Sequence, residues 1–274
     1  MSKRNCPDME NRSSAVLLAQ AKYRANVGAL LFLYRCTMPM ISFAVGRLGR
    51  FASNSGPEHQ AEMTHLLRYI NGVRDMGLRY SRDALADGAE KSLPQCQLYN
   101  YNKDKADFKC YTDSDFAGCV DSSRSTSGGV ITWMGAAICW NSNLQSCVTL
   151  STAEAEMVAM RKAAHECIWL RRYMKYLFGE NSLDGKPTKI YCDNQATLQL
   201  VDNRIHHSRT KHIRLRGNFV REYKDLGELD PVYVATKMNI ADGFTKPIKK
   251  DTIESHSFEL TGMKMKYAEK PANQ

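Results

Sequence analysis

The chain contains 274 residues, 43% of them hydrophobic, with 38 Lys and Arg against 29 Asp and Glu and a formal net charge of +9. This apolar content is enough to bury the core of one large or two modest domains, and the positive charge favours a polyanionic partner. The nine cysteines include no CxxC pair, which argues against a zinc site and a disulfide-bonded secreted protein and favours reduced thiols in an intracellular setting.

The N-terminal third predicts a module of buried helices. Its first residues lack the apolar core of a signal peptide. The apolar segment from Val27 to Val45 is interrupted by Arg35 and Pro39, which predicts two helices that meet at a kink and argues against a membrane span. Another helix is predicted at residues 57–72, and a short strand is expected at residues 77–83.

The C-terminal two thirds of the chain alternate between strand and helix patterns in the order βββαβααβα, which predicts an α/β fold. Trp133, Trp140 and Trp169 lie in apolar elements, so we expect them to pack in the core rather than to stack on bases. Cys110 and Cys192 are interpreted as small core residues in the same way. The predicted strands are 108–112, 128–134, 137–140, 188–192 and 229–235, and the predicted helices are 152–177, 194–201, 213–226 and a short one from residue 239.

Composition also predicts where the domains begin and end. A polar stretch rich in Asp, Ala and Gly follows the helical module and places a boundary between about 90 and 105. The segment after Lys249 is charged and is expected to be loosely held. The predicted divisions are a disordered or loosely held N-terminus at 1–21, a helical module at 22–92, a linker at 93–105, an α/β domain at 106–248 and a C-terminal tail at 249–274.

Carboxylates lie at the ends of predicted strands or the starts of predicted helices, namely Asp113, Glu156, Asp193 and Asp242. Asp193 directly follows a β-branched and aromatic run, so it is expected at the carboxyl end of a strand, where open α/β sheets bind ligands. Acidic side chains that converge at such an edge can hold divalent cations for phosphodiester hydrolysis. Taken singly, each acid is also a common turn former or cap, and for Asp242 an N-cap is the main alternative.

Two neighbouring acids compete with these positions. Ser151 and Glu154 have the spacing of a capping box, whereas Glu156 falls on the helix face that is expected to pack on the sheet. A carboxylate on a buried face is costly unless a cation or hydrogen bonds compensate it, which favours Glu156 as the ligand. Asp115 alternates with Asp113, and we expect Asp115 to raise the local negative charge or to stabilise the loop.

The segments around the acids read YTDSDFAG, SRSTSGGVITWMGAAICWNS, LSTAEAEM, KIYCDNQATLQL, RTKHIRLRGNFVREY and NIADGFTKPI. With these motifs, the sequence from Phe108 to Pro247 resembles the ribonuclease H domain of copia-type retrotransposon Pol polyproteins. The helical segments upstream resemble the part that closes the reverse transcriptase and connects it to the nuclease. The sequence TMPM at residues 37–40 departs from the Arg-Pro-Asp that relatives usually carry.

The resemblance implies a ribonuclease H-like fold, which is a mixed five-stranded sheet with helices on both faces. It also implies hydrolysis of the RNA strand of RNA–DNA hybrids with two Mg²⁺ ions, for which Mn²⁺ is a possible substitute. By the same resemblance, Asp113 bridges both ions, Asp242 completes the site that activates water, and Glu156 with Asp193 holds the ion that faces the leaving group. Some related nucleases carry a mobile histidine before the last acid; here that function is absent or falls to Lys237.

Basic residues near these motifs are candidates for contacts with nucleic acid. Lys211 and His212 fall in a family motif, and Arg214 stands where related sequences often carry an acidic residue. For this run, phosphate binding and a solvated helix face are equally good interpretations. Arg124 is a further candidate for a phosphate contact, although shaping of a hairpin is the first interpretation of its segment. Hybrids would be selected by groove shape and 2′-hydroxyl contacts rather than by base sequence.

No YxDD-like pair of polymerase aspartates occurs in the chain, so we do not expect it to copy nucleic acid unaided. The expected partners are an RNA–DNA hybrid and the remaining polymerase portion of a polyprotein, with no membrane. The expected location is intracellular, either in a cytoplasmic virus-like particle or in the nucleus. The main alternative is a domesticated, non-catalytic nucleic-acid-binding or interaction protein that retains the fold, and a transposase or resolvase that cuts DNA is a third possibility.

Overall fold

A mixed sheet of five strands forms the centre of the larger part of the structure. The computed structural model describes residues 2–7, 13–80, 108–179, 183, 185–203, 211–265 and 267, so the predicted linker at 93–105 lies outside the described residues. The spatial order of the strands is β3-β2-β1-β4-β5. The strands are β1 (Lys109–Ser114), β2 (Thr126–Trp133), β3 (Ala136–Leu144), β4 (Thr188–Cys192) and β5 (Leu229–Tyr233).

The central strand β1 pairs antiparallel with β2 and parallel with β4, while β2 pairs antiparallel with β3 and β4 pairs parallel with β5. The helices that accompany the sheet are α4 (Thr152–Phe178), α5 (Gln195–Asp202), α6 (Lys211–Asp225), η6 (Thr236–Met238), η7 (Ile240–Phe244) and α7 (Lys250–Thr261). The predicted order βββαβααβα is confirmed, with a 3-10 helix, η7, as the short last element.

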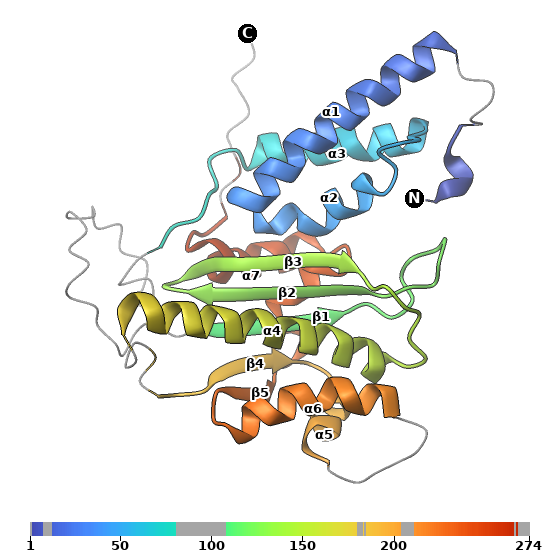
Figure 1. The fold of residues 1–274 in the computed structure, drawn as a ribbon. Helices are drawn as coiled ribbons and strands as arrows, with labels where there is room; N and C mark the ends of the chain where they lie inside the picture. Colours follow the sequence, from blue (N-terminus) through green and yellow to red (C-terminus); the bar gives the residue numbers. More distant parts are fainter. Residues whose placement is uncertain are drawn as a thin grey trace, which may run out of the picture.

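Helices cover both faces of the sheet, as Figure 1 shows. On one face, α4, α5 and α6 share an apolar core with the strands, in which Met157, Ile190 and Val220 are fully buried. On the other face, η7 and α7 bury Phe244 and Leu260 against β1, β2 and β3. The predicted α/β class, with a mixed sheet between two helical layers, is therefore confirmed.

Residues 250–261 are not part of the loosely held tail that the charge of the C-terminal segment predicted. Residues 250–261 form α7, whose buried Leu260 belongs to the core on the second face of the sheet. Tyr111 on β1 also donates a hydrogen bond to Glu259 Oε1 at 2.7 Å. The helix ends at Gly262, which has the left-handed φ of +70° that glycine adopts without strain. The few apolar residues of this charged segment are therefore enough to dock α7 against the sheet.

The helical module begins earlier than predicted. Ser13 caps its first helix by accepting a hydrogen bond from Val16 N at 3.3 Å, and buried Gln20 donates to Asn54 Oδ1 at 3.0 Å. The expectation of a loosely held N-terminus up to residue 21 is therefore wrong from residue 14 onwards. The module consists of α1 (Ser14–Cys36), η2 (Pro39–Ile41), α2 (Ser42–Gly49) and α3 (Pro57–Gly72).

The predicted kink lies at Pro39, where η2 separates α1 from α2. The predicted strand at 77–83 is absent from residues 77–80, the described part of it. The segment is tied to the C-terminal helix instead, because Arg79 N donates to Thr261 O at 2.7 Å. Among the described helices, none combines the length and the apolar character needed to cross a membrane.

The three tryptophans do not share one environment. Trp133 and Trp140 pack against the two cores of the sheet, as predicted, and Trp140 Nε1 donates to Tyr34 O of the helical module at 2.9 Å. Trp169 is 57% exposed and stacks on Tyr173, with 5.5 Å between the ring centroids. The core prediction for Trp169 is therefore wrong, because other residues of α4 face the sheet.

Gly128 of β2 leaves no space for a side chain, so we expect Gly128→Ala to destabilise the protein. A Cβ atom there would lie 2.7 Å from Thr245 Cγ2 and 2.8 Å from Phe244 Cβ. Because such overpacking forces the backbone to shift, the free energy of unfolding should fall by about 1–3 kcal/mol in urea denaturation. Gly28→Ala is a suitable control, since a Cβ at this position in α1 meets nothing within 4 Å. Equal stability of Gly128→Ala and the wild type would contradict this packing.

Candidate metal centre

Two parallel strands bring two of the predicted acids to one edge of the sheet. The register of β1 and β4 pairs Tyr111 with Tyr191, and Asp113 and Asp193 each stand two residues further along. The carboxyl ends of neighbouring parallel strands meet at the same edge, where α/β sheets commonly bind ligands. Asp113 is buried and Asp193 is partly buried, so this edge holds negative charge with limited access to water.

Two helical elements add the other acids. Glu156 lies near the start of α4 and Asp242 lies within η7, on the other face of the sheet. Carboxylate oxygens of Asp113, Asp193 and Asp242 lie within 4.8 Å of one another. Oxygens of Glu156 and Asp193 lie within 4.8 Å of each other and of the Cys192 sulfur. Because Asp193 belongs to both groups, the structure gathers all four predicted acids, which we call the carboxylate cluster.

Glu156 is held in place by the backbone of β1. Its Oε1 accepts a hydrogen bond from Ser114 N at 3.0 Å, and its Oε2 lies 3.9 Å from the thiol of Cys192. Burial, reinforced by the charges of Asp113 and Asp193, raises the pKa of Glu156 to about 9. Burial also raises the pKa of Cys192, so this residue remains a neutral thiol, which is a weak metal ligand.

Asp113 has both compensating and opposing neighbours. Thr245 Oγ1 donates a hydrogen bond to its Oδ2, and Lys246 Nζ lies 3.9 Å from the same oxygen. Burial raises the pKa of Asp113 to about 6 in spite of Lys246, and the negative charges of Asp242 and Asp193 add to the rise. The local cations and donors therefore do not fully compensate the ionised carboxylate.

Asp242 does not act as the cap of its helix. Asn239 performs that function, because its Oδ1 accepts a hydrogen bond from Ala241 N at 3.2 Å. The N-capping alternative for Asp242 is therefore wrong. One oxygen of Asp242 pairs with Lys246 Nζ at 3.1 Å, whereas Oδ1 is buried and has no hydrogen-bond partner among the described residues. Burial raises the pKa of this acid as well.

Lys246 and Thr245 were not among the residues singled out in the sequence. Lys246 stands four residues after Asp242, a spacing at which side chains on a helical turn commonly meet, and this was the available signal. Lys237, which was considered as an aid beside the last acid, is exposed in η6. Of the two lysines, Lys246 is the one that pairs with the cluster, where its charge partly offsets that of Asp113 and Asp242.

The competing acids have structural roles. Ser151 caps α4 by accepting from Glu154 N at 3.2 Å, as predicted, but the Glu154 carboxylate accepts from Leu150 N at 2.8 Å. It also forms an ion pair with Arg216 at 3.6 Å. Asp115 accepts a hydrogen bond from Thr126 N, which ties the loop after β1 to β2. Neither Glu154 nor Asp115 belongs to the groups that could hold a metal ion.

The cluster fits divalent cations such as Mg²⁺ or Mn²⁺. Carboxylate oxygens are the hard ligands that these ions prefer. The unpartnered Oδ1 of Asp242 and the raised pKa values of Asp113, Glu156 and Asp242 indicate that the protein alone does not compensate the ionised forms of these acids. A bound cation would supply this neutralisation, because a positive ion close to a carboxylate favours its ionised form.

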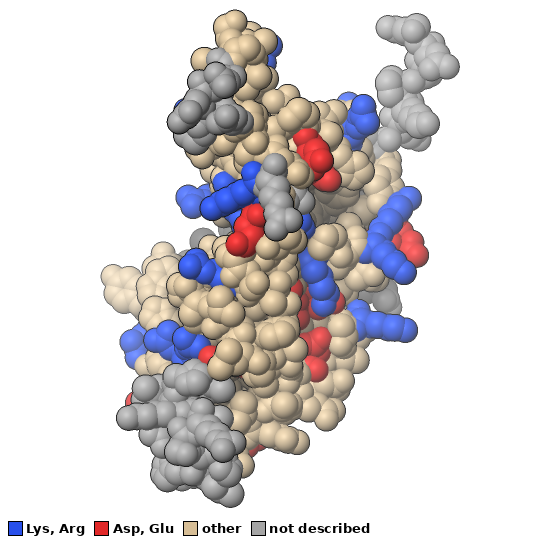
Figure 2. Space-filling model, turned by 90° about the vertical axis from the view of Figure 1, so that its right-hand side faces the viewer, with Lys and Arg blue, Asp and Glu red and all other residues tan. Residues whose placement is uncertain are grey.

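The predicted contacts with nucleic acid are only partly described. Arg124 is exposed in the loop between β1 and β2, where it is free to meet a phosphate. Lys211, His212 and Arg214 lie in α6, but their side chains are outside the described part of the structure. Figure 2 views the molecule from the side to which the carboxyl ends of β1 and β4 point. It shows acidic side chains in a hollow of this face, with Lys and Arg side chains around them.

The chain is similar in sequence to proteins of mobile elements. It is 35% identical over 264 residues to the retrovirus-related Pol polyprotein from transposon TNT 1-94 of Nicotiana tabacum, a match that covers 96% of this chain and 18% of that protein. It is 30% identical over 259 residues to the corresponding protein from transposon RE2 of Arabidopsis thaliana, covering 94% and 16%. The chain therefore spans less than a fifth of the length of these relatives. No protein-family model matches it.

Solved structures of ribonuclease H domains are also similar to the chain. The N-terminal RNase H domain of Rv2228c from Mycobacterium tuberculosis is 10% identical, with a TM-score of 0.36, and the match covers 55% of this chain and 96% of that one. LC11-RNase H1, solved in complex with an RNA/DNA hybrid, is 15% identical, with a TM-score of 0.37 and coverage of 50% and 93%.

Proposed function

Because this chain belongs to the retrovirus-related Pol polyproteins of copia-type transposons and carries a ribonuclease H-like fold, we propose that it hydrolyses the RNA strand of RNA–DNA hybrids. The reaction would depend on Mg²⁺. The observation that supports this proposal best is the carboxylate cluster itself, in which acids from β1, α4, η7 and the end of β4 come together. A structural role alone does not account for so many buried acids at one place, because burial and mutual repulsion make their ionised forms unfavourable.

In this function Asp113, Glu156, Asp193 and Asp242 would hold the metal ions. When bound, Mg²⁺ would lower the pKa of an attacking water and offset the charge on the leaving oxygen. The backbone N–H of Ser114 fixes the direction of Glu156, and the hydroxyl of Thr245 does the same for Asp113. These hydrogen bonds hold the carboxylates in position before a substrate arrives, which lowers the cost of ordering them during the reaction.

We further infer that the chain works beside the rest of a polyprotein, since it spans 18% of the tobacco relative. The remaining portion would supply the polymerase that makes the hybrid. The place of action would then be the site of reverse transcription inside the cell, either a virus-like particle in the cytoplasm or the nucleus.

Cleavage of a panel of labelled substrates tests the proposal. The wild type and Asp193→Asn are incubated with an RNA–DNA hybrid, duplex DNA and duplex RNA, each in Mg²⁺ and in EDTA. We expect cleavage only of the RNA strand of the hybrid, only by the wild type and only with Mg²⁺, because Asp193 is shared by both groups of potential ligands. Binding without cleavage would favour the non-catalytic alternative, and cutting of duplex DNA would favour a transposase-like activity.

A further inference from the structure

The C-terminal end of α2 lies on the same side of the molecule as the carboxylate cluster. In Figure 1, α2 runs towards the side to which the carboxyl ends of β1 and β4 also point, whereas α1 and α3 end on the opposite side. Arg47 lies in the last turn of α2, and Arg50 follows its end. Arg47 and Arg50 therefore lie at the end of α2 that faces the same side of the molecule as the cluster.

Arg50 is close to the loop that follows β1. Its positive charge acts on Asp115 and on Cys119, which both lie in that loop. Arg50 thus lies beside the segment that carries the first acid of the cluster, although it comes from the other structural module.

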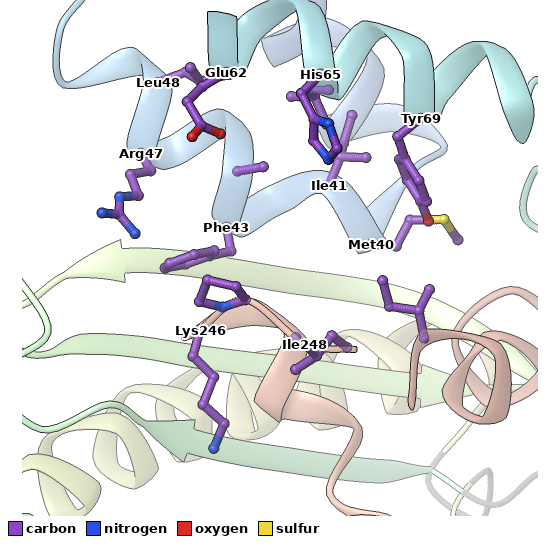
Figure 3. Close-up of a pocket in the computed structure, with 15 residues that line it drawn as sticks. Met40, Ile41, Phe43, Arg47, Leu48, Glu62, His65, Tyr69, Lys246 and Ile248 are labelled. Atoms are coloured by element: carbon purple, nitrogen blue, oxygen red, sulfur yellow. The ribbon is translucent and has the colours of Figure 1, made fainter. Parts of the chain in front are cut away.

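Arg47 lines the same pocket as Lys246, the lysine that pairs with the cluster. Both line a pocket of about 460 Å³ between α2, α3 and the segment after η7. Figure 3 shows Phe43 between Arg47 and Lys246 at one end of this pocket. The guanidinium of Arg47 lies 6.0 Å from the centre of the Phe43 ring, and the ammonium of Lys246 reaches Asp242 and Asp113. Arg47 and Lys246 therefore line one end of the same pocket, with the Phe43 ring between them.

Neither arginine forms an ion pair within the described residues, where no carboxylate lies within 4.0 Å of Arg47 or Arg50. Glu62 lines the same pocket as Arg47 but does not form an ion pair with it. Both arginine side chains are partly exposed. Unpaired, partly exposed guanidinium groups are well suited to bidentate contacts with phosphate oxygens.

Packing holds α2 firmly against the strand that supports η7. Gly46 faces β3, where a Cβ would make an ordinary van der Waals contact with Ser142 O at 3.6 Å. The hydroxyl of the same Ser142 donates to Phe244 O at 2.6 Å, two residues after Asp242. Ser142 of β3 is therefore in contact both with α2 and with η7, the element that carries Asp242.

We propose that Arg47 and Arg50 bind the phosphate backbone of the nucleic acid whose RNA strand lies at the carboxylate cluster. The helical module then provides part of the substrate surface and is not only a connection. This inference rests on the proposed function, because the class of ligand, a nucleic acid, comes from that function. Such contacts position a duplex without reading its sequence.

Equilibrium binding of a fluorescent RNA–DNA hybrid in EDTA, from 50 to 200 mM salt, tests the assignment. We expect Arg47→Gln/Arg50→Gln to bind about tenfold more weakly at about 100 mM salt and to reduce the slope of log K against log[salt] by about 2. The matched control is Arg35→Gln/Arg74→Gln, which removes the same charge from exposed positions. These positions lie near the C-terminal ends of α1 and α3, on the side of the molecule away from the cluster (Figure 1). This control loses two positive charges but no phosphate contact, so its affinity for the hybrid should fall at most about twofold.

Arg47→Lys/Arg50→Lys should recover most of the affinity and the salt slope, and thermal melting checks that each variant is folded. Equal affinities of the two Gln double variants would overturn the assignment while leaving cleavage by the wild type, and with it the proposed function, intact. The converse result is that the wild type binds hybrid without cleaving it while only Arg47→Gln/Arg50→Gln loses affinity. That result would support the phosphate contacts of the two arginines and overturn the proposed hydrolase activity. Failure of the wild type to bind hybrid would overturn both.

Discussion

Replacement of Asp113 by Asn should abolish hybrid cleavage and stabilise the metal-free protein at the same time. A neutral amide cannot balance the charge of two cations, so we expect a rate loss of at least about 10³-fold, equivalent to about 4 kcal/mol of transition-state stabilisation. In the metal-free protein, burial raises the pKa of Asp113 from 3.8 to about 6. The ionised form therefore costs on the order of 3 kcal/mol at neutral pH, and Asn removes this cost.

The matched control for this prediction is Asp115→Asn. It removes the same charge two residues away, and its amide oxygen can still accept the hydrogen bond from Thr126 N. Cleavage by Asp115→Asn should stay within a few-fold of the wild type. Single-turnover cleavage and thermal melting in EDTA check both parts of the prediction. A melting temperature of Asp113→Asn below that of the wild type would show that Asp113 supports the fold, contrary to the repulsion that its surroundings imply.

The stability of the metal-free protein should fall as the pH rises. The folded-state pKa values of Asp113 and Glu156 are raised to about 6 and about 9, from 3.8 and 4.5. Between its unfolded and folded values, each acid binds more protons in the native state than in the unfolded chain, so a rising pH favours unfolding. The stabilisation is fully present below about pH 4. It is lost through about pH 6 for Asp113 and about pH 9 for Glu156.

Mg²⁺ should counteract this loss, because a cation that binds only the folded cluster stabilises it more as the acids ionise. Melting temperatures measured from pH 5 to 9, in EDTA and in Mg²⁺, should therefore diverge towards high pH. We expect a decrease of roughly 5–15 °C in EDTA. Glu156→Gln should lose most of that decrease above pH 6, since its amide does not titrate. Parallel curves for Glu156→Gln and the wild type would show that another group causes the pH dependence.

Local sequence patterns predicted the elements that carry the cluster. The sequence predicted a strand at Thr188–Cys192, which are its observed limits. This was possible because the run rich in β-branched and aromatic residues stops before Asp193. The choice between Glu154 and Glu156 also followed from local rules, since a capping serine and a buried helix face are both visible as spacings. The spatial meeting of the four acids agrees with that choice, whereas their role as metal ligands stays a prediction.

Features that depend on tertiary contacts were missed. Nothing local to α7 distinguishes a docked helix from a charged tail, because its attachment comes from Tyr111, Val130 and Arg79, which are distant in sequence. Trp169 was assigned to the core on its apolar neighbours, but the sheet lies on the other side of α4. The role of Lys246 likewise depends on the position of η7 beside β1. The spacing of four residues from Asp242 could suggest that Lys246 pairs with this acid but could not establish it.

The docking of α7 has a consequence for the way the protein is made. Synthesis of β1, β2 and β3 is complete at residue 144, but Val130 and Ala137 of these strands pack in one cluster with Leu260 of α7. During synthesis, this face of the sheet stays bare for more than a hundred further residues. Such exposed apolar surface invites misassembly on a nascent chain. Folding of this face of the sheet therefore cannot be completed until α7 has been synthesised.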